Sequence, residues 1–388
     1  MRIANPIAYI VLYGVLYAAF GAASPFWPKF FETRALTPQQ IGSILAAAML
    51  VRLVSGPCVG RLADVLGSLR LVLASCAVVA AMAAVALIWA DEFWLLLLLA
   101  VAQAAALAPT TSIADALSVN AAKSQMTGRQ FEYGWIRGSG SAAFILGTLV
   151  VGQLIGPADL TPVLWMNASL LFAAACATAL VSPVTAQVAP ETGARLAVGE
   201  VRGLLKIPRF RILILVSALI YGSHSMHDAF AVIRWSDADL STSLISFLWS
   251  EAVAAEVVVF FLVGPALVDR FGAHGAATLA AAAGIIRWLI AGVTTSAWLL
   301  SIIQPLHGLT FALLHLACMR VMRTLVPTGV AATAQTLYAF GAALVSAVLI
   351  SVSGILYARF TGAAFLPMAA LCGVALPFAW FGFAREST

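Results

Sequence analysis

Long apolar stretches, separated by short polar breaks, restrict what this chain can fold into more than any single motif does. Runs of about 20 apolar residues recur from one end of the sequence to the other, and a helix needs a run of that length to cross a bilayer. The runs are continuous and do not alternate with period two, which argues against a membrane β-barrel. With 62% hydrophobic and only 10% charged residues, the chain lacks the charge that the surface of a soluble domain needs. The sequence therefore predicts an all-α integral membrane protein.

The most polar stretch of the chain lies near its middle, and we interpret residues 187–209 as a cytoplasmic linker. It carries Arg195, Arg202, Lys206 and Arg209 within a sequence that is otherwise poor in charge. Each flanking part is about 180 residues long, which is enough for six helices of about 20 residues and their connections. We therefore expect two six-helix halves, at residues 1–186 and 210–388.

Twelve transmembrane helices fit the apolar pattern, and their basic flanks indicate the orientation. We expect them at residues 6–28, 39–60, 70–89, 93–120, 131–155, 163–185, 210–233, 241–266, 275–295, 298–323, 329–357 and 362–384. Of the 21 Lys and Arg residues, only Lys29, Arg34, Arg234 and Arg359 fall on the ends that this order places outside. Because positive residues collect on the cytoplasmic side, we expect both termini in the cytoplasm and the protein in the inner (cytoplasmic) membrane.

Several other classes of protein are not indicated. The five cysteines lie in apolar runs without paired or metal-ligand spacing, so neither a disulfide framework nor a metal site is expected. The first apolar run is too long for a cleavable signal peptide. The net charge of +5 follows the membrane topology and does not indicate nucleic acid binding. We expect a monomer in the lipid bilayer, without a cofactor.

A short polar motif occurs twice, at corresponding places in the two halves. The first copy, GRLADVLGSLR, follows the second expected helix, and LVDRFG stands 205 residues later, after the eighth. The residues that matter are Gly60, Asp64, Gly67 and Arg70 in the first copy, and Asp269 and Gly272 in the second. The glycines permit a tight turn, and an aspartate there either caps a helix or takes part in gating. The repetition predicts two pseudo-symmetric halves.

The first copy of this motif resembles the signature loop of the major facilitator superfamily, and the second copy is the echo that the superfamily's symmetry would produce. The resemblance implies the fold of that superfamily, with substrate bound between the halves near the bilayer midplane. It also implies that the loop latches the halves on the cytoplasmic side in one state of the transport cycle.

Besides Arg52 in the second expected helix, two charged residues of the first half fall inside apolar spans. Asp115 lies in the second half of the fourth expected helix, and Arg137 lies near the start of the fifth. An arginine in an apolar span needs a polar cavity or a carboxylate, and Asp115 or Glu132 is the carboxylate within reach along the sequence. The stretch FEYGWIRGSG also resembles the fifth helix of the lactose permease family, which implies that Arg137 is the essential arginine of that family.

The second half carries more polar residues inside its spans. In YGSHSMHDAF, His224 and Asp228 are four positions apart and are expected on one helix face, with His227 pointing elsewhere. Such a pair either carries a proton or joins two helices. In the eighth helix, Glu251 and Glu256 are five positions apart and cannot face the same cavity on a regular helix.

An arginine and a histidine of the ninth and tenth helices give the closest resemblance. Arg287 and His307 are expected mid-span and lie twenty residues apart. That spacing resembles the lactose permease family, and the surrounding sequence resembles the phenylpropionate permease branch of the superfamily still more, over essentially the whole chain. The branch implies that Glu256 is the functional acid of the eighth helix, and we expect it to pair with Arg287. Thr310 stands where the lactose permease family has its proton-carrying glutamate.

These features together predict a secondary transporter that works by alternating access and symports protons. A threonine cannot titrate, so we expect the proton site on Glu256, His307, His315 or Asp115. Protonation is expected to release Arg287 to the substrate, which we expect to be a small organic carboxylate, preferably an aromatic one.

Two other functions compete with this prediction. A proton-coupled sugar or nucleoside symporter stays open, because Gln103, Asn120, Gln304 and Gln335 could bind hydroxyl groups. A non-transporting membrane enzyme or receptor is disfavoured, since the sequence has no nucleophile elbow, metal-ligand spacing or phosphate loop, and no soluble domain.

Overall fold

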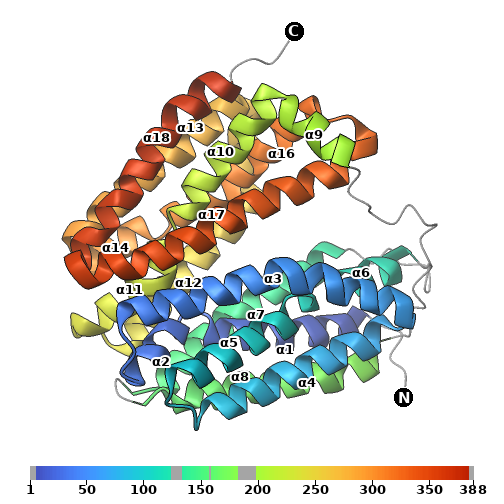
Figure 1. Ribbon diagram of the computed structural model, residues 1–388, viewed down its shortest axis with the longest axis vertical. Coiled ribbons are helices and arrows are strands. Elements are labelled where there is room, and N and C mark those ends of the chain that lie inside the picture. The colour runs from blue at the N-terminus through green and yellow to red at the C-terminus, as the bar shows by residue number, and fades with distance from the viewer. Residues whose placement is uncertain (1–5, 124–132, 157–158, 182–197, 384–388) are drawn as a thin grey trace. The chain divides into compact units, whose positions relative to one another are not determined.

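Helices account for the regular structure of this protein. The computed structural model describes residues 6–123, 133–156, 159–181 and 198–383 (Figure 1). No β-strand occurs in these ranges, so the predicted all-α architecture is confirmed.

The helices follow one another with short connections. The N-terminal part contains α1 Pro6–Ala23, α2 Trp27–Thr33, α3 Pro38–Leu66, α4 Leu69–Leu87, α5 Phe93–Leu107, α6 Thr110–Lys123, α7 Tyr133–Leu154, α8 Thr161–Ala177 and the 3-10 turn η1 Thr178–Leu180. The C-terminal part contains α9 Val198–Lys206, α10 Pro208–Gly222, α11 Ser225–Asp237, α12 Thr242–Val258, the π-helix η2 Val259–Val263, α13 Gly264–Val293, α14 Ala297–Ile303, α15 Leu306–Gly308, the π-helix η3 Leu309–Leu313, α16 Leu314–Leu325, the 3-10 turn η4 Thr328–Val330, α17 Ala331–Phe360, the 3-10 helix η5 Thr361–Phe365 and α18 Leu366–Phe383.

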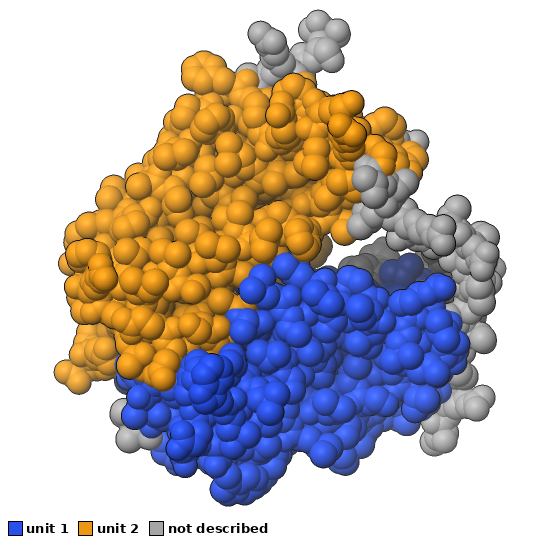
Figure 2. All heavy atoms as spheres, viewed as in Figure 1, with its two compact units in different colours: residues 1–36, 47–193, 241–246 blue, residues 37–46, 194–240, 247–388 orange. Residues whose placement is uncertain are grey.

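The chain divides into two compact units (Figure 2). Unit 1 comprises residues 1–36, 47–193 and 241–246, and unit 2 comprises residues 37–46, 194–240 and 247–388. The first turns of α3 thus belong to unit 2, and the first turn of α12 belongs to unit 1. Helix α9 lies within the expected linker, whose residues 187–197 fall outside the described part of the chain, so the linker itself stays a prediction.

Small residues bring the helices of unit 1 together. Helix α1 packs along α7, and α4 packs against α5 and α8. At Gly147 of α7 a Cβ would collide with the backbone of Ala18 in α1, so only glycine permits this approach. Close approach adds van der Waals contact, which stabilises helix pairs in a bilayer. The apolar core around these helices includes Leu12, Leu16, Leu73 and Leu171.

Alanines play the same part in unit 2. Helix α13 packs along α18, and α10 packs against α17 and α18. The alanines that α13 contributes to the core recur every three or four positions and therefore share one face: Ala273, Ala276, Ala277, Ala280 and Ala281. This frame positions the polar side chains that α11, α12, α13 and α15 carry.

The helices of the described residues are long and apolar enough for a multi-pass membrane protein. Eight helical stretches meet the requirement, and a ninth is formed if α1 and α2, which meet at 44°, count as one bent span. Two of the eight, residues 242–293 and 331–383, each run through two of the expected helices.

Prolines interrupt two of the helices that the sequence predicted to be continuous. The helix expected at residues 93–120 consists of α5 and α6, which meet at Pro109. The helix expected at residues 298–323 is interrupted at Pro305. Proline lacks a backbone N–H, and its ring collides with the preceding turn.

A serine accompanies a third interruption. The helix expected at residues 210–233 is divided into α10 and α11 at Ser223 and His224. The Ser223 hydroxyl donates to the Ile220 carbonyl at 2.6 Å, and a side-chain bond of this kind competes with the helical hydrogen bonds.

The glycines in the two copies of the polar motif both have a positive φ. Gly67, between α3 and α4, has a φ of 63°, and Gly272, inside α13, has a φ of 68°. Residues with a Cβ rarely adopt this conformation, whereas glycine does so without strain. Gly272 breaks α13 close to the place where the sequence predicted that two helices meet. Both glycines therefore have the turn geometry that the sequence indicated.

Candidate functional site

A buried arginine lies at the centre of the polar residues of unit 2. Arg287, in α13, is 1% exposed. Its Nη1 lies 3.0 Å from Nδ1 of His307, and its Nη2 lies 3.1 Å from Oε1 of Gln304 and 3.5 Å from Nε2 of His227. Its Nε is buried and has no hydrogen-bond partner among the described residues. Because a guanidinium only donates, each of these partners accepts, and the Nε–H is left unused.

The hydrogen bonds of Gln304 determine which nitrogen of His227 carries the proton. Oε1 of Gln304 accepts from Arg287, while its amide nitrogen donates to the Leu248 carbonyl at 3.3 Å. The same nitrogen lies 3.4 Å from Nε2 of His227, so Nε2 accepts. In the neutral ring the proton is then on Nδ1, which lies 3.3 Å from Oδ1 of Asp228. His227 therefore connects Asp228 to Arg287.

A second histidine connects Arg287 to a second carboxylate. His307, in α15, accepts from Arg287 at Nδ1, so its neutral ring carries the proton on Nε2. Nε2 lies 3.6 Å from Oε2 of Glu256 in α12. The π-helices η2 and η3 follow Glu256 and His307 within a few residues, and such segments often occur at functional sites.

A third histidine belongs to the same cluster. Nε2 of His224 lies 2.9 Å from the hydroxyl of Thr310, which is fully buried. The rings of His224 and His307 lie 5.1 Å apart, measured between centroids. The structure thus brings together five of the residues that the sequence singled out in the second half: His224, Glu256, Arg287, His307 and Thr310.

Tryptophan rings surround His227. Trp249 stacks on the imidazole with a centroid distance of 5.0 Å, and the rings of Trp235 and Trp288 lie 5.6 and 5.8 Å away. The Trp288 ring also lies 4.5 Å from the guanidinium carbon of Arg287. The cluster is therefore polar at its centre and aromatic around it.

The expected direction of His227 was wrong. The sequence placed His224 and Asp228 on one face and turned His227 away, whereas His227 contacts Arg287 and the Asp228 side chain is 53% exposed. Residues three positions apart share a helix face as residues four apart do, and the Asp228 N–H donates to the His224 carbonyl at 2.9 Å, so the turn that carries both histidines is helical.

The expected ion pair between Glu256 and Arg287 was also wrong. The His307 ring bonds to both residues, and in the described part of the chain no carboxylate forms an ion pair with Arg287. Glu251 contacts a different residue, Ser301, whose hydroxyl donates to it at 2.8 Å. The two glutamates of α12 therefore have separate partners, as their spacing indicated.

In unit 1, two tyrosines of α1 contact the predicted charged residues. Nη1 of Arg137 donates to the Tyr17 hydroxyl, and the Tyr13 hydroxyl donates to Oδ1 of Asp115. The two tyrosine rings stack with centroids 5.6 Å apart and planes 9° apart. Sequence reasoning missed both tyrosines, although their spacing of four residues puts them on one face of α1. Glu132, the other expected partner of Arg137, lies outside the described residues.

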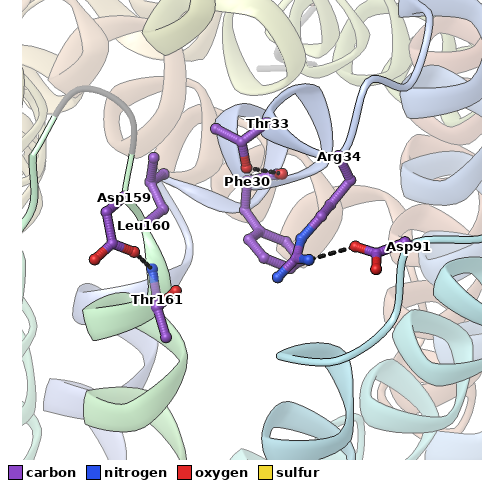
Figure 3. Close-up of a pocket in the computed structure, with 7 residues that line it drawn as sticks. All are labelled: Phe30, Thr33, Arg34, Asp91, Asp159, Leu160 and Thr161. Carbon is purple, nitrogen blue, oxygen red and sulfur yellow. Dashed lines mark hydrogen bonds and ion pairs between the residues drawn. The ribbon is translucent and has the colours of Figure 1, made fainter.

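Unit 1 also contains a pocket of about 350 Å³ (Figure 3). Arg34 forms an ion pair with Asp91 there at 2.5 Å, and hydrogen bonds from the hydroxyl and backbone N–H of Thr161 lower the pKa of the Asp159 carboxyl. None of the residues predicted for substrate binding or coupling lines this pocket, so we do not place the substrate there. The lining residues are Phe30, Thr33, Arg34, Asp91, Asp159, Leu160 and Thr161.

Comparison with known proteins decides the family. A family model described as the MFS_1 like family matches residues 7–366. The chain belongs to the MFS_1 like family, within the major facilitator superfamily. This MFS_1 like protein is 28% identical over 320 residues to the "Probable 3-phenylpropionic acid transporter" of Escherichia coli (strain K12), with 79% of each chain covered. It is 27% identical over 339 residues to the "Maltose permease" of Geobacillus stearothermophilus, with 86% of this chain and 83% of the relative covered.

Solved structures agree with the predicted fold of the superfamily. The nucleoside transporter NupG matches with a TM-score of 0.84 at 18% identity, over 97% of this chain and 98% of that one. A D-xylose–proton symporter matches with a TM-score of 0.71 at 16% identity, over 98% of both chains. The family match and the transporter relatives make the MFS_1 like protein a transporter and not an enzyme.

The repeated loops of this transporter make different contacts in the two units. In unit 2, Asp269 forms an ion pair with Arg320 of α16 at 2.7 Å. In unit 1, the Asp64 side chain is exposed, and Arg70 donates to the Ala179 carbonyl at 3.4 Å. Gly60 lies within α3 rather than in the turn. The gating role of these residues stays a prediction.

His315 and the amides that the sequence suggested for sugar binding do not form one site. His315 packs beside the rings of Phe260 and Tyr338, at centroid distances of 6.0 and 6.3 Å. Gln103 donates to Asn167 at 2.9 Å in unit 1. Of the three predicted amides whose side chains the structure describes, Gln304 contacts Arg287, Gln103 has this separate partner, and Gln335 is exposed.

Proposed function

We propose that this MFS_1 like transporter symports protons with a small aromatic carboxylate by alternating access. The observation that carries the proposal is the state of Arg287, which is buried among neutral acceptors and keeps its Nε–H unused among the described residues. A buried charge without a counter-ion costs several kcal/mol in a protein interior. An anionic substrate would supply the missing charge.

A carboxylate suits Arg287 better than a neutral ligand does. The planar guanidinium presents parallel N–H donors that match the two oxygens of a carboxylate. A substrate carboxylate would accept from Nε and from one Nη nitrogen, where it would replace a neutral partner such as Gln304. We infer that Arg287 is the anion-binding residue of unit 2.

The surroundings of Arg287 favour a substrate that carries a ring. Trp288 lies against the guanidinium, Trp249 stacks on His227, and Phe311 stacks on His307 at 5.5 Å. Aromatic side chains bind ligand rings by stacking and edge contacts. A phenylpropionate combines a ring with a carboxylate, and the Escherichia coli relative is named for such a compound.

Glu256 is the proton carrier that we propose for this site. It is connected to Arg287 through His307. A substrate carboxylate at Arg287 and a proton on Glu256 would favour each other, because the proton compensates the negative charge that the substrate brings into the cluster. Because binding linkage is reciprocal, a bound proton also strengthens substrate binding. Proton symport requires that proton binding and substrate binding strengthen each other in this way.

We also propose a monomer in the inner membrane with both termini in the cytoplasm. The orientation rests on the distribution of basic residues, which collect on the helix ends that are cytoplasmic in this arrangement. A cysteine-accessibility measurement on residues near the termini in right-side-out vesicles tests the orientation.

A proton-coupled sugar or nucleoside symporter is the second candidate. The maltose permease relative and the likeness to the fold of a nucleoside transporter favour it. Sugar hydroxyls need several amide or carboxylate partners, and in the Arg287 cluster Gln304 already uses both ends of its amide. The contacts of the cluster therefore favour an anion over a polyol.

Uptake into proteoliposomes tests the proposal. We would supply labelled organic acids, sugars and nucleosides with and without an imposed pH gradient, and use protein-free liposomes to measure passive entry of undissociated acid. We expect accumulation of 3-phenylpropionate or a related acid when the outside is acidic, and no response to a sodium gradient. Accumulation of maltose or of a nucleoside, with none of the acids transported, would establish the second candidate.

A further inference from the structure

Two carboxylates are connected to Arg287 in the same way, each through one histidine. On one side, Oδ1 of Asp228 lies 3.3 Å from His227, whose other nitrogen lies 3.5 Å from Nη2 of Arg287. On the other side, Oε2 of Glu256 lies 3.6 Å from His307, whose other nitrogen lies 3.0 Å from Nη1 of Arg287. The guanidinium thus lies between two histidine–carboxylate pairs.

From this arrangement we propose that Asp228 is a second proton-binding carboxylate, so that the transporter moves two protons with each substrate molecule. This inference rests on the proposed proton symport and adds its stoichiometry. A proton would bind to the carboxylate of Asp228, and a second proton to that of Glu256. His227 and His307 would stay neutral and pass the effect of the guanidinium charge to the two acids.

The hydrogen bonds support a neutral His227 that donates to Asp228. Arg287 and the Gln304 amide nitrogen both point donors at Nε2, which therefore accepts. The proton on Nδ1 is then directed at Oδ1 of Asp228. A substrate carboxylate that takes over the donors of Arg287 adds a negative charge to the cluster, and a proton on Asp228 would compensate it.

Three other titratable groups of unit 2 have partners of their own. His224 bonds Thr310, and Glu251 accepts from Ser301. Cys372, in α18, contacts Ser223 at 3.3 Å. Within the described residues, Arg287 is thus the charged group to which the pair of His227 and Asp228 connects.

In each pair the carboxylate side chain is more exposed than the histidine side chain. The side chain of Asp228 is 53% exposed, whereas that of His227 is 7% exposed. The corresponding values are 31% for Glu256 and 18% for His307. Both acids can therefore exchange protons with their surroundings, while both histidines are shielded.

The proton number can be read from the accumulation that a pH gradient supports. We would hold the membrane potential at zero with potassium and valinomycin, impose one pH unit, and measure the steady-state ratio of labelled 3-phenylpropionate inside and outside proteoliposomes. Each coupled proton contributes a factor of about 10 to that ratio under these conditions. If the uptake panel identifies another substrate, the same measurement is made with that compound.

The expected result is a graded loss of accumulation. Because passive entry of the undissociated acid alone raises the ratio toward about 10, we would measure the ratio at which the net flux through the transporter, corrected for the flux into protein-free liposomes, is zero. We expect this ratio to be about 100 for the natural protein, about 10 for Asp228→Asn and for Glu256→Gln, and about 1 for the double variant. His227→Gln should behave like Asp228→Asn, because it disconnects the acid from Arg287. Equilibrium exchange of substrate should persist in each Asp228 and Glu256 variant, which shows that the protein is folded and binds substrate.

A matched control is available at Asp239. This residue is exposed and has a φ of 60°, a conformation that asparagine tolerates, so Asp239→Asn should keep the full ratio. Accumulation of about 10-fold in both the natural protein and Asp228→Asn would overturn the second proton site and leave proton symport intact. A natural protein that shows no response to the pH gradient would instead contradict the proposed function itself.

Discussion

Nη1 of Arg287 lies 3.0 Å from Nδ1 of His307, and the imidazole ring stands between the guanidinium and Glu256. The ring accepts from the arginine on one side and presents its other nitrogen to the carboxylate on the other side. A direct ion pair would have neutralised Arg287 and reduced its attraction for an anionic substrate. The intervening histidine leaves the arginine available and still lets Glu256 respond to its charge.

Replacing Arg287 by lysine should weaken substrate binding without unfolding the protein. Lysine keeps the charge, but it cannot donate from fixed positions to His307, Gln304 and a carboxylate together. We expect the Kd for the transported acid to rise about tenfold or more, since a hydrogen bond to a charged group contributes ~1.5–3 kcal/mol. Substrate-dependent thermal stabilisation of the purified protein measures this change. Arg359→Lys, at an exposed position at the end of α17, is the control and should bind normally.

Replacing Glu256 by glutamine should separate exchange from coupling. Glutamine resembles the protonated acid and cannot release a proton, so substrate exchange across the membrane should persist. Accumulation driven by one pH unit should fall by about tenfold, the contribution of one proton. Glu251→Gln is the matched control, because its carboxylate bonds Ser301 instead of His307. If Glu251→Gln lost coupling and Glu256→Gln kept it, the proton carrier would be the other glutamate of α12.

Replacing Arg137 by glutamine should abolish uptake while the protein stays folded. Arg137 bonds Tyr17 inside an apolar span, and removing a costly charge there leaves no large cavity. Uptake and the melting temperature in detergent are the two measurements. Tyr17→Phe keeps the ring and removes the acceptor, so we expect it to reduce uptake less. Transport near the natural rate by Arg137→Gln would make the arginine a purely structural residue.

Replacing Gly67 by alanine should destabilise the protein by about 1 kcal/mol, because a left-handed conformation costs ~1–2 kcal/mol for a residue with a Cβ. No heavy atom lies within 4 Å of the added Cβ, so the backbone conformation alone causes the loss. Gly60→Ala is the matched control, since the space there is equally open and the residue lies within α3. Denaturant unfolding in detergent compares the two variants. Equal stability of both would show that the turn tolerates alanine.

Sequence patterns predicted the features that depend on neighbouring residues and the charges that are energetically unfavourable inside a membrane. Long apolar runs predicted the all-α membrane fold, and the repeated motif predicted the turns at Gly67 and Gly272. Charges inside apolar spans singled out Arg287 and Arg137, because a membrane protein carries such residues only where they are needed.

Sequence patterns were insufficient where contacts depend on how helices pack. His227 was assigned to the wrong face although its spacing of three from His224 also puts the two on one face of a helix. Its contact with Arg287 joins α11 to α13 across 60 positions of sequence. Tyr13 contacts Asp115 across 102 positions of sequence, a distance that spacing rules cannot bridge. The position of His307 between Arg287 and Glu256 likewise depends on the packing of α15, α13 and α12, and no single stretch of sequence predicts it.

The most direct test of proton-coupled carboxylate transport is the external pH when 3-phenylpropionate is added to lightly buffered proteoliposomes. We expect the external pH to rise as protons enter with the acid, and to rise more than in proteoliposomes that carry Arg287→Gln, which report passive entry alone. Equal pH changes for the natural protein and Arg287→Gln, while the natural protein takes up labelled acid faster, would contradict proton symport at Arg287.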